Sequence, residues 1–184
     1  MGACPTVETE RLVLRPFRES DLDAYTRVMQ APAVRASLHL PDDVGREQAW
    51  SGMAASLGQW ELRGTGQWAA IEKASGELVG RVGSHWPERA DWPGIEIGWS
   101  LHPDHWGKGY ATEGGRATIG YVFEHHDVTE VFSVILEDNV RSQAVARRLG
   151  FELFETRVTA HFPTAPHGIW RLPRQRVDTQ LVDT

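Results

Sequence analysis

The amino-acid sequence predicts a mixed α/β domain built on one sheet. Three observations lead to this fold class. The chain has 184 residues, which fits one domain of ordinary size. Strand-like segments follow one another directly at 67–73, 77–85 and 94–101, and this order favours an antiparallel meander. Helical and strand-like periodicities then alternate between 110 and 150, which indicates parallel strands joined by a helical crossover.

The N-terminal third is predicted to form a strand and two helices. Residues 11–15 alternate like a strand that ends at Pro16, and residues 20–23 resemble a capping box that opens a helix. The buried face of this helix is expected to carry Leu22, Tyr25 and Met29. A second helix is predicted over 46–62, with four apolar side chains at helical spacing: Trp50, Met53, Leu57 and Trp60.

The C-terminal half is predicted to contain two helices and three strands. A helix is expected at 110–125, an apolar strand at 130–136, and a helix at 140–149 that Gly150 closes. Two last segments, 151–161 and 169–176, are expected to pair as an antiparallel hairpin. The whole chain, 1–184, is therefore interpreted as a single domain with a core over about 9–177 and a frayed tail at 178–184.

Composition narrows the class of protein. Hydrophobic residues make up 41% of the chain and charged residues 24%, which is typical of a soluble globular protein. The formal net charge of −6 argues against a nucleic acid or a membrane surface as partner. The sequence has neither a secretory signal pattern nor an apolar run of roughly 20 residues, so a cytoplasmic protein is expected. Cys4 is the sole cysteine, which excludes an internal disulfide and a multi-cysteine metal site.

A glycine-containing loop between a predicted strand and a predicted helix is the first candidate binding site. Gly107 and Gly109 allow the backbone to approach a ligand closely, and the free amides at the start of the following helix favour an anion such as a diphosphate. A turn that only changes the chain direction is the alternative. A dinucleotide fingerprint and a P-loop are both excluded, because Thr112 stands where the third glycine of the fingerprint is needed and Lys108 is followed by glycine instead of Ser or Thr.

A second segment, about thirty residues further on, has an Asn139 cap, Ser142 one turn later, and the Gly150 stop. Together with 9–17, 96–99 and 106–113, this segment resembles the GNAT superfamily of N-acetyltransferases, and in particular its ribosomal-protein alanine N-acetyltransferase (RimJ/RimL) branch. The resemblance covers most of the chain. It implies a GNAT fold: an antiparallel N-terminal meander, a central parallel strand pair that is splayed to hold acetyl-CoA, and helices on both faces.

The resemblance also implies acetyl-CoA as co-substrate, without a metal. The pyrophosphate would be held by backbone amides of 106–112, and the pantetheine would run between the strands at 94–101 and 130–136. An amide near 99–101 would polarise the thioester carbonyl. The residues that the resemblance assigns to coenzyme binding are Trp99, Ser100, Leu101, Trp106, Gly107, Lys108, Gly109, Tyr110, Ala111, Thr112, Asn139 and Ser142.

Two positions differ from the pattern of many superfamily members. Trp106 stands where many members have Gln or Arg, and a Trp at this position is usual in the RimJ/RimL branch. Ala146 stands where many members have the Tyr that protonates the departing thiolate. Glu96 is the candidate base that deprotonates the amine, directly or through water, because it lies on the expected central strand just before the splay. Ser142 is the candidate group that stabilises or protonates the thiolate, a role that the resemblance to RimL implies. The alternatives are a hydrogen bond or ion pair within the sheet for Glu96 and a helix-start hydroxyl for Ser142.

The predicted function is transfer of an acetyl group from acetyl-CoA to a primary amine by direct attack. By resemblance a peptide or protein N-terminal amine leads. A small-molecule amine such as an antibiotic or an amino-acid derivative, and a non-catalytic coenzyme-A-binding regulatory domain, stay open as alternatives. The acceptor site is expected between the loops 31–45 and 161–168, and a homodimer could form through a C-terminal strand edge.

Histidines and tryptophans are two further residue types with a possible place in the site. His102 and His105 have a three-residue spacing, but no third ligand completes a metal site. His125 and His126 end a helix, where a structural role is favoured. Trp50, Trp86 and Trp106 are candidates for the walls of the acceptor site, besides ordinary core positions.

Overall fold

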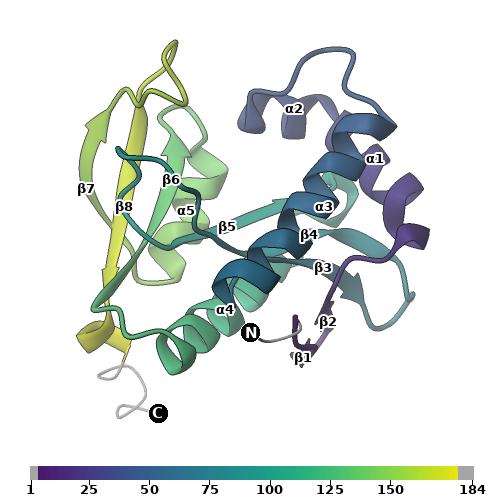
Figure 1. Ribbon diagram of the computed structural model, residues 1–184, viewed down its shortest axis with the longest axis horizontal. Helices are drawn as coiled ribbons and strands as arrows, with labels where there is room; N and C mark the ends of the chain where they lie inside the picture. The colour runs from purple at the N-terminus through teal and green to yellow at the C-terminus, as the bar shows by residue number, and fades with distance from the viewer. Residues whose placement is uncertain (1–3, 178–184) are drawn as a thin grey trace.

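The computed structural model describes residues 4–177, and in these residues eight strands form one sheet in the order β1-β2-β3-β4-β5-β6-β8-β7 (Figure 1). The strands are β1 Val7–Glu8, β2 Leu12–Arg15, β3 Gln67–Glu72, β4 Leu78–His85, β5 Glu96–Leu101, β6 Glu130–Leu136, β7 Glu152–Arg157 and β8 His167–Pro173. The α-helices are α1 Leu22–Gln30, α2 Pro32–Leu38, α3 Arg46–Arg63, α4 Tyr110–His125 and α5 Val140–Arg148. The predicted tail at 178–184 lies outside the described residues.

The sheet confirms the mixed α/β class. Strands β1 to β5 form an antiparallel meander, and α4 then crosses over to β6, which runs parallel to β5. The predicted C-terminal hairpin is also present, because β7 pairs antiparallel with β8. However, β8 and not β7 is the neighbour of β6. The burial pattern explains this order, since β8 is almost entirely buried while β7 is exposed along most of its length and lies at the edge.

Helices cover both faces of the sheet. Helix α4 packs on β4 and β5, whereas α1 and α3 pack together on the opposite side of the meander (Figure 1). The close approach of α4 depends on two glycines that lack a side chain. A Cβ atom built on Gly114 would lie 3.0 Å from Val82 of β4, and one built on Gly115 would lie 2.7 Å from Leu149. Among the described residues, no helix is long and apolar enough to cross a bilayer.

The predicted buried face of α3 was wrong for two of its four residues. Met53 and Trp60 are buried, but the side chains of Trp50 and Leu57 are 51% and 39% exposed. The buried stripe instead includes Ala49 and Ser56. These positions follow the helical period once small and polar residues are counted, which an apolar pattern alone overlooks.

The start of α1 also differs from the predicted capping box at 20–23. The backbone amide of Arg18 donates to the carboxylate of Asp21 at 2.8 Å, and the Arg15 guanidinium donates two hydrogen bonds to the same carboxylate. The carboxylate that accepts the capping hydrogen bond is therefore that of Asp21. This carboxylate is buried and forms an ion pair with Arg15. A further difference is α2, which occupies part of the predicted loop 31–45 and has Pro32 in its first turn.

Candidate active site

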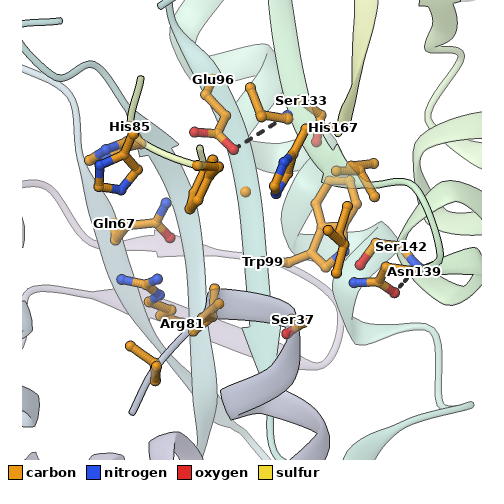
Figure 2. Close-up of a pocket in the computed structure, with 18 of the residues that line it drawn as sticks. Ser37, Gln67, Arg81, His85, Glu96, Trp99, Ser133, Asn139, Ser142 and His167 are labelled. Atoms are coloured by element: carbon orange, nitrogen blue, oxygen red, sulfur yellow. Dashed lines mark hydrogen bonds between the residues drawn. The ribbon is translucent and has the colours of Figure 1, made fainter. Parts of the chain in front are cut away.

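A cavity of about 380 Å³ opens on the face of the sheet that α1 and α3 cover. Figure 2 shows His85, Gln67 and Arg81 on one side of this cavity, and Asn139 and Ser142 on the other. The predicted catalytic residues Glu96 and Ser142 both line it, so the fold brings together two residues that are separated by a helix and a strand.

Glu96 lies at the first residue of β5, where the parallel pairing with β6 ends. Its carboxylate accepts a hydrogen bond from the backbone amide of Val134 at 3.4 Å. Burial raises the pKa of Glu96 to about 7, although the Val134 amide and the positive charges of Arg81 and Arg89 lower it. A carboxyl group with a pKa near 7 can accept a proton at neutral pH and remains protonated in a large fraction of molecules.

The gap between β5 and β6 follows from the backbone geometry. The two strands are in register only at Glu96 and Phe132, and the amide of Phe132 donates to the carbonyl of Ile95 at 2.9 Å. Backbone groups of successive residues in a strand point to opposite edges, so alternate residues of each strand face the gap. On β6 the amide of Val134 faces this way and bonds the Glu96 side chain instead of β5. On β5 the peptide groups of Trp99 face the open gap.

The same alternation separates the three predicted residues at the end of β5. The amide of His102 donates to the carbonyl of Val79, so even-numbered residues of this segment pair with β4, and Ser100 is one of them. The carbonyl of Leu101 accepts a hydrogen bond from the Trp106 indole at 2.8 Å. Trp99 and Leu101 therefore both orient their amides toward the gap, and the Leu101 carbonyl on that side is already bonded to Trp106.

The predicted phosphate loop leads from β5 into α4 in the expected order. Gly107 and Gly109 have φ angles of 76° and 85°, values at which a side chain is strained. The first hydrogen bond of α4 runs from the amide of Glu113 to the carbonyl of Gly109. The amides of Tyr110, Ala111 and Thr112 precede this bond, and they form the positive end of the helix.

The side chains of the loop have structural contacts. The Tyr110 hydroxyl donates to Glu72, and the Lys108 amine lies 3.7 Å from the same carboxylate. Hydrogen bonds from Tyr110 and Ser75, assisted by Lys108, lower the pKa of Glu72 to about 2. The Trp106 ring lies under the guanidinium of Arg141, 4.8 Å from the ring centre. These residues therefore offer backbone groups to a ligand while their side chains hold the loop in place.

Asn139 and Ser142 meet at the start of α5. The Asn139 side chain accepts a hydrogen bond from the amide of Ser142 at 3.1 Å and caps the helix (Figure 2). Within residues 4–177, no side chain or backbone group is bonded to the Ser142 hydroxyl. Ala146, at the position of the expected Tyr, is fully buried in the core, so α5 presents no phenol there.

The two predicted acceptor loops both line the cavity. Loop 31–45 contributes Ser37, Leu38 and Leu40, and loop 161–168 contributes His161, Phe162 and His167. The loops touch, because Nε2 of His39 lies 3.3 Å from Nε2 of His167. The expected tryptophans are not part of this cavity: Trp50 is exposed, Trp86 lines a separate hollow with His125 and His126, and Trp106 belongs to the loop. Trp92 and Trp99 line the cavity in their place.

Several cavity residues were missed by sequence reasoning: Gln67, Arg81, His85, Arg89, Trp92 and Ser133. The signal that points to two of them is strand register. His85 is opposite Glu96, Arg81 is opposite Ser100, and both share the sheet face of Glu96. The pairing was predicted from the meander, but the register was not. Among residues 4–177, no group of three His, Cys, Asp or Glu residues with metal-binding geometry is present.

Comparison with known proteins identifies the family. A model of the acetyltransferase (GNAT) domain matches residues 11–152, so the chain belongs to the GNAT acetyltransferases and is an acetyl-CoA-dependent N-acetyltransferase. A solved acetyltransferase from Agrobacterium tumefaciens is 30% identical, with a TM-score of 0.79 over 95% of this chain and 97% of that one.

Two further proteins are similar to the chain. The FsC-acetyl coenzyme A-N(2)-transacetylase of Aspergillus fumigatus is 28% identical over 182 residues, which cover 91% of this chain and 73% of that protein. RimL, a ribosomal L7/L12 alpha-N-protein acetyltransferase solved in complex with coenzyme A, shares the fold, with 19% identity and a TM-score of 0.75 over 92% of this chain and 98% of that one.

Proposed function

We propose that this protein acetylates the primary amine of a peptide or protein N-terminus, with acetyl-CoA bound between β5 and β6 and the amine bound beside Glu96. The observation that carries the proposal is the gap between the two parallel strands. It exposes the Trp99 amide on β5 and joins the cavity that contains Glu96 and Ser142, and β5 leads on through the glycine loop to the first amides of α4.

The residues of the gap fit the coenzyme. Pantetheine amides can bond to the peptide groups of Trp99 and of the β6 residues as an added strand would. The amides of Tyr110, Ala111 and Thr112, after two glycines with positive φ, are suited to the pyrophosphate. Asn139 caps α5 at the edge of the cavity, and its side-chain amide is directed to the same space.

Glu96 is proposed as the base. The nitrogen lone pair of the amine attacks the thioester carbonyl carbon, the C–N bond forms, and the C–S bond breaks with its electron pair leaving on sulfur. The proton released by the amine passes to the Glu96 carboxylate, directly or through water. A peptide α-amine has a reference pKa near 8, close to the pKa of about 7 for Glu96, so this transfer needs little driving force.

Trp99 and Ser142 are proposed to stabilise the developing charges. The Trp99 amide faces the gap and can donate to the carbonyl oxygen as it becomes an oxyanion. The Ser142 hydroxyl, at the start of α5, can donate to the thiolate, and the positive end of the helix adds to this effect. The buried Ala146 leaves no phenol on α5 for the task, which supports Ser142.

A small-molecule amine is the second candidate acceptor. Two observations favour it: the cavity is partly closed by the contact between His39 and His167, and the Aspergillus fumigatus relative is named for an acetyl transfer to FsC.

A homodimer is also proposed. The exposed edge strand β7, with Leu153 and Phe154 on its surface, supports it, and sedimentation or light scattering tests it.

The experiment that tests the function is thiol release from acetyl-CoA with a panel of peptides and small amines, together with calorimetry of coenzyme A. We expect binding, and thiol release that depends on the acceptor, with the acetyl group found on the amine by mass spectrometry. Binding without release for every acceptor would instead indicate a coenzyme-A-binding domain.

A further inference from the structure

The floor of the cavity contains a charged group that the acetyl-transfer chemistry does not require. Arg81 lies on β4 and lines the cavity, partly buried. No hydrogen bond or ion pair joins its guanidinium to any of residues 4–177, whereas surface arginines such as Arg11 and Arg63 have carboxylate partners. The positive charge of Arg81 lowers the pKa of Glu96, but the two side chains form no ion pair. Arg81 therefore faces the cavity with unused donors.

No side chain of β4 or β5 stands between Arg81 and Glu96 on this face of the sheet. Along β4 and β5, His85 is opposite Glu96, Gly83 is opposite Gly98, and Arg81 is opposite Ser100, all on one face. Gly83 and Gly98 add no side chain in the middle, where the side-chain nitrogen of Gln67 lies 3.4 Å from a Cβ built on Gly98. A ligand that lies along this floor can have one end at the Glu96 carboxyl group and the other end at the Arg81 guanidinium.

Two polar atoms beside this floor also lack partners. The side-chain carbonyl oxygen of Gln67 and the indole nitrogen of Trp92 are buried without a hydrogen bond to the described residues. Both residues line the cavity, and the Gln67 amide lies 3.4 Å from a Cβ built on Gly98. A buried polar atom without a partner is costly, and in a binding site the ligand normally supplies the partner. Gln67 offers an acceptor, and Trp92 offers a donor.

The charge of the cavity is opposite to that of the chain. Of the described residues that line it, Arg81 and Arg89 are cationic and Glu96 is the only acid. The chain as a whole has a net charge of −6. Arg89 is partly occupied, because its guanidinium stacks 4.8 Å from the Trp92 ring centre. A local cationic site in an acidic protein favours an anionic ligand group.

We propose that the acceptor is an amine that also carries a carboxylate, and that Arg81 selects it by binding that carboxylate. This inference rests on the proposed function. The acceptor amine lies at Glu96 with an N–H group donated to Gln67, and its carboxylate extends past the Gln67 side chain to Arg81. The carboxylate belongs either to a free amino acid or to an acidic residue near the N-terminus of a peptide.

The test compares matched acceptors that differ only at the carboxylate. One arm uses ω-amino acids of two to five carbons and their amides, and the other uses Ala-Asp and Ala-Asn peptides with amidated ends. Thiol release gives kcat/KM for each. We expect the acid of the better arm to exceed its neutral partner by about 10- to 100-fold, as for a hydrogen-bonded charge. The arm with the larger ratio identifies the source of the carboxylate.

The variant Arg81→Gln separates this role from general damage. We expect the acid-to-amide ratio to fall toward one in Arg81→Gln and to recover partly in Arg81→Lys. The matched control is Arg116→Gln, because Arg116 is exposed on α4, a helix on the other face of the sheet that contributes no residue to the cavity lining (Figure 1). Circular dichroism and thermal unfolding check that each variant is folded.

Three results would overturn the inference. Equal kcat/KM for acids and amides, with thiol release in both, would show that the acceptor's carboxylate is not recognised, while the acetyltransferase function stands. An unchanged acid-to-amide ratio of kcat/KM in folded Arg81→Gln would show that a residue other than Arg81 binds the carboxylate. A loss of coenzyme A affinity in Arg81→Gln as large as the loss of acceptor preference assigns Arg81 to the coenzyme. Failure of the proposed function itself looks different, because no acceptor then releases thiol although coenzyme A binds.

Discussion

His85 and Glu96 are directly opposite each other in the register of β4 and β5, and their pKa values are shifted in opposite directions. Burial lowers the pKa of His85 to about 4 and raises that of Glu96 to about 7. In both cases burial disfavours the charged form. Between these two values both side chains are mostly neutral, so the protein holds two uncharged titratable groups at the proposed site of amine attack.

The first prediction concerns the pH dependence of activity. If Glu96 is the base, kcat/KM rises as the pH increases through about 7, because the carboxylate form becomes more populated. Glu96→Gln is expected to lower kcat by roughly 100-fold or more and to remove this rise. Steady-state kinetics from pH 5.5 to 9 provide the measurement. A variant profile that keeps the wild-type inflection near 7 contradicts the assignment.

The second prediction concerns stability and uses the same pair. Between pH 4.5 and 7 the folded protein holds a proton on Glu96 that the unfolded chain has released, so this residue makes stability fall as pH rises. Between pH 4 and 6.5 His85 acts in the opposite sense, because the unfolded chain binds the proton there. The two contributions largely cancel in the wild-type protein.

Glu96→Gln removes one side of this balance. The free energy of unfolding of the variant, relative to the wild type, should increase by about 1.4 kcal/mol per pH unit between 4.5 and 7. Urea unfolding at several pH values measures this difference, and other titrating groups cancel in the subtraction. A difference that is constant with pH would show that Glu96 titrates normally.

The third prediction separates Asn139 from Ser142 at the start of α5. Asn139→Ala removes the side chain that accepts a hydrogen bond from the Ser142 amide and should reduce the free energy of unfolding by about 1 kcal/mol. Ser142→Ala removes a hydroxyl without a partner among the described residues, so stability should hardly change while kcat falls more than coenzyme A affinity. An unchanged kcat in Ser142→Ala would contradict the proposed role of the Ser142 hydroxyl at the thiolate.

The fourth prediction tests the phosphate loop. Gly109→Ala places a side chain at φ 85° and 3.3 Å from the Arg11 guanidinium, whereas at Gly107, with φ 76°, the added Cβ has open space. Each change strains the backbone by about 1–2 kcal/mol, and Gly109→Ala should weaken coenzyme A binding more. Gly120→Ala is the control, since an open helical position should gain about 0.5–1 kcal/mol with no change in binding. Calorimetry that shows equal affinity in all three variants contradicts the loop assignment.

Much of the fold could be predicted because its elements have strong local signals. The helix α4 and the strand β6 have the predicted bounds, and Gly150 ends α5 with a φ of 90°. The strand order at the C-terminal end was less accessible. Pairing of β8 with β6 depends on which strand buries more surface, and this is a property of the finished sheet and not of either segment alone.

Part of the lining of the cavity could be predicted, while the roles of these residues stay predictions. Glu96 was expected from its place on the central strand just before the gap and Ser142 from the resemblance, and both line one cavity with the loops 31–45 and 161–168. Arg81, Gln67 and Trp92 gave no signal, because single polar residues in strands and loops look like ordinary surface positions until the register fixes the face on which they lie.

The contact between Arg11 and the loop links two distant parts of the chain. The Arg11 guanidinium donates to the carbonyl of Lys108 at 2.8 Å and to Glu113 at 2.7 Å, and the Thr9 hydroxyl also donates to Glu113. If coenzyme A immobilises the loop, its binding should also protect the amides of the β1–β2 hairpin from hydrogen exchange. Amide hydrogen exchange in β2 should slow on binding, and an amino-terminal fusion or trimming that disturbs Thr9 should lower coenzyme affinity from a distance.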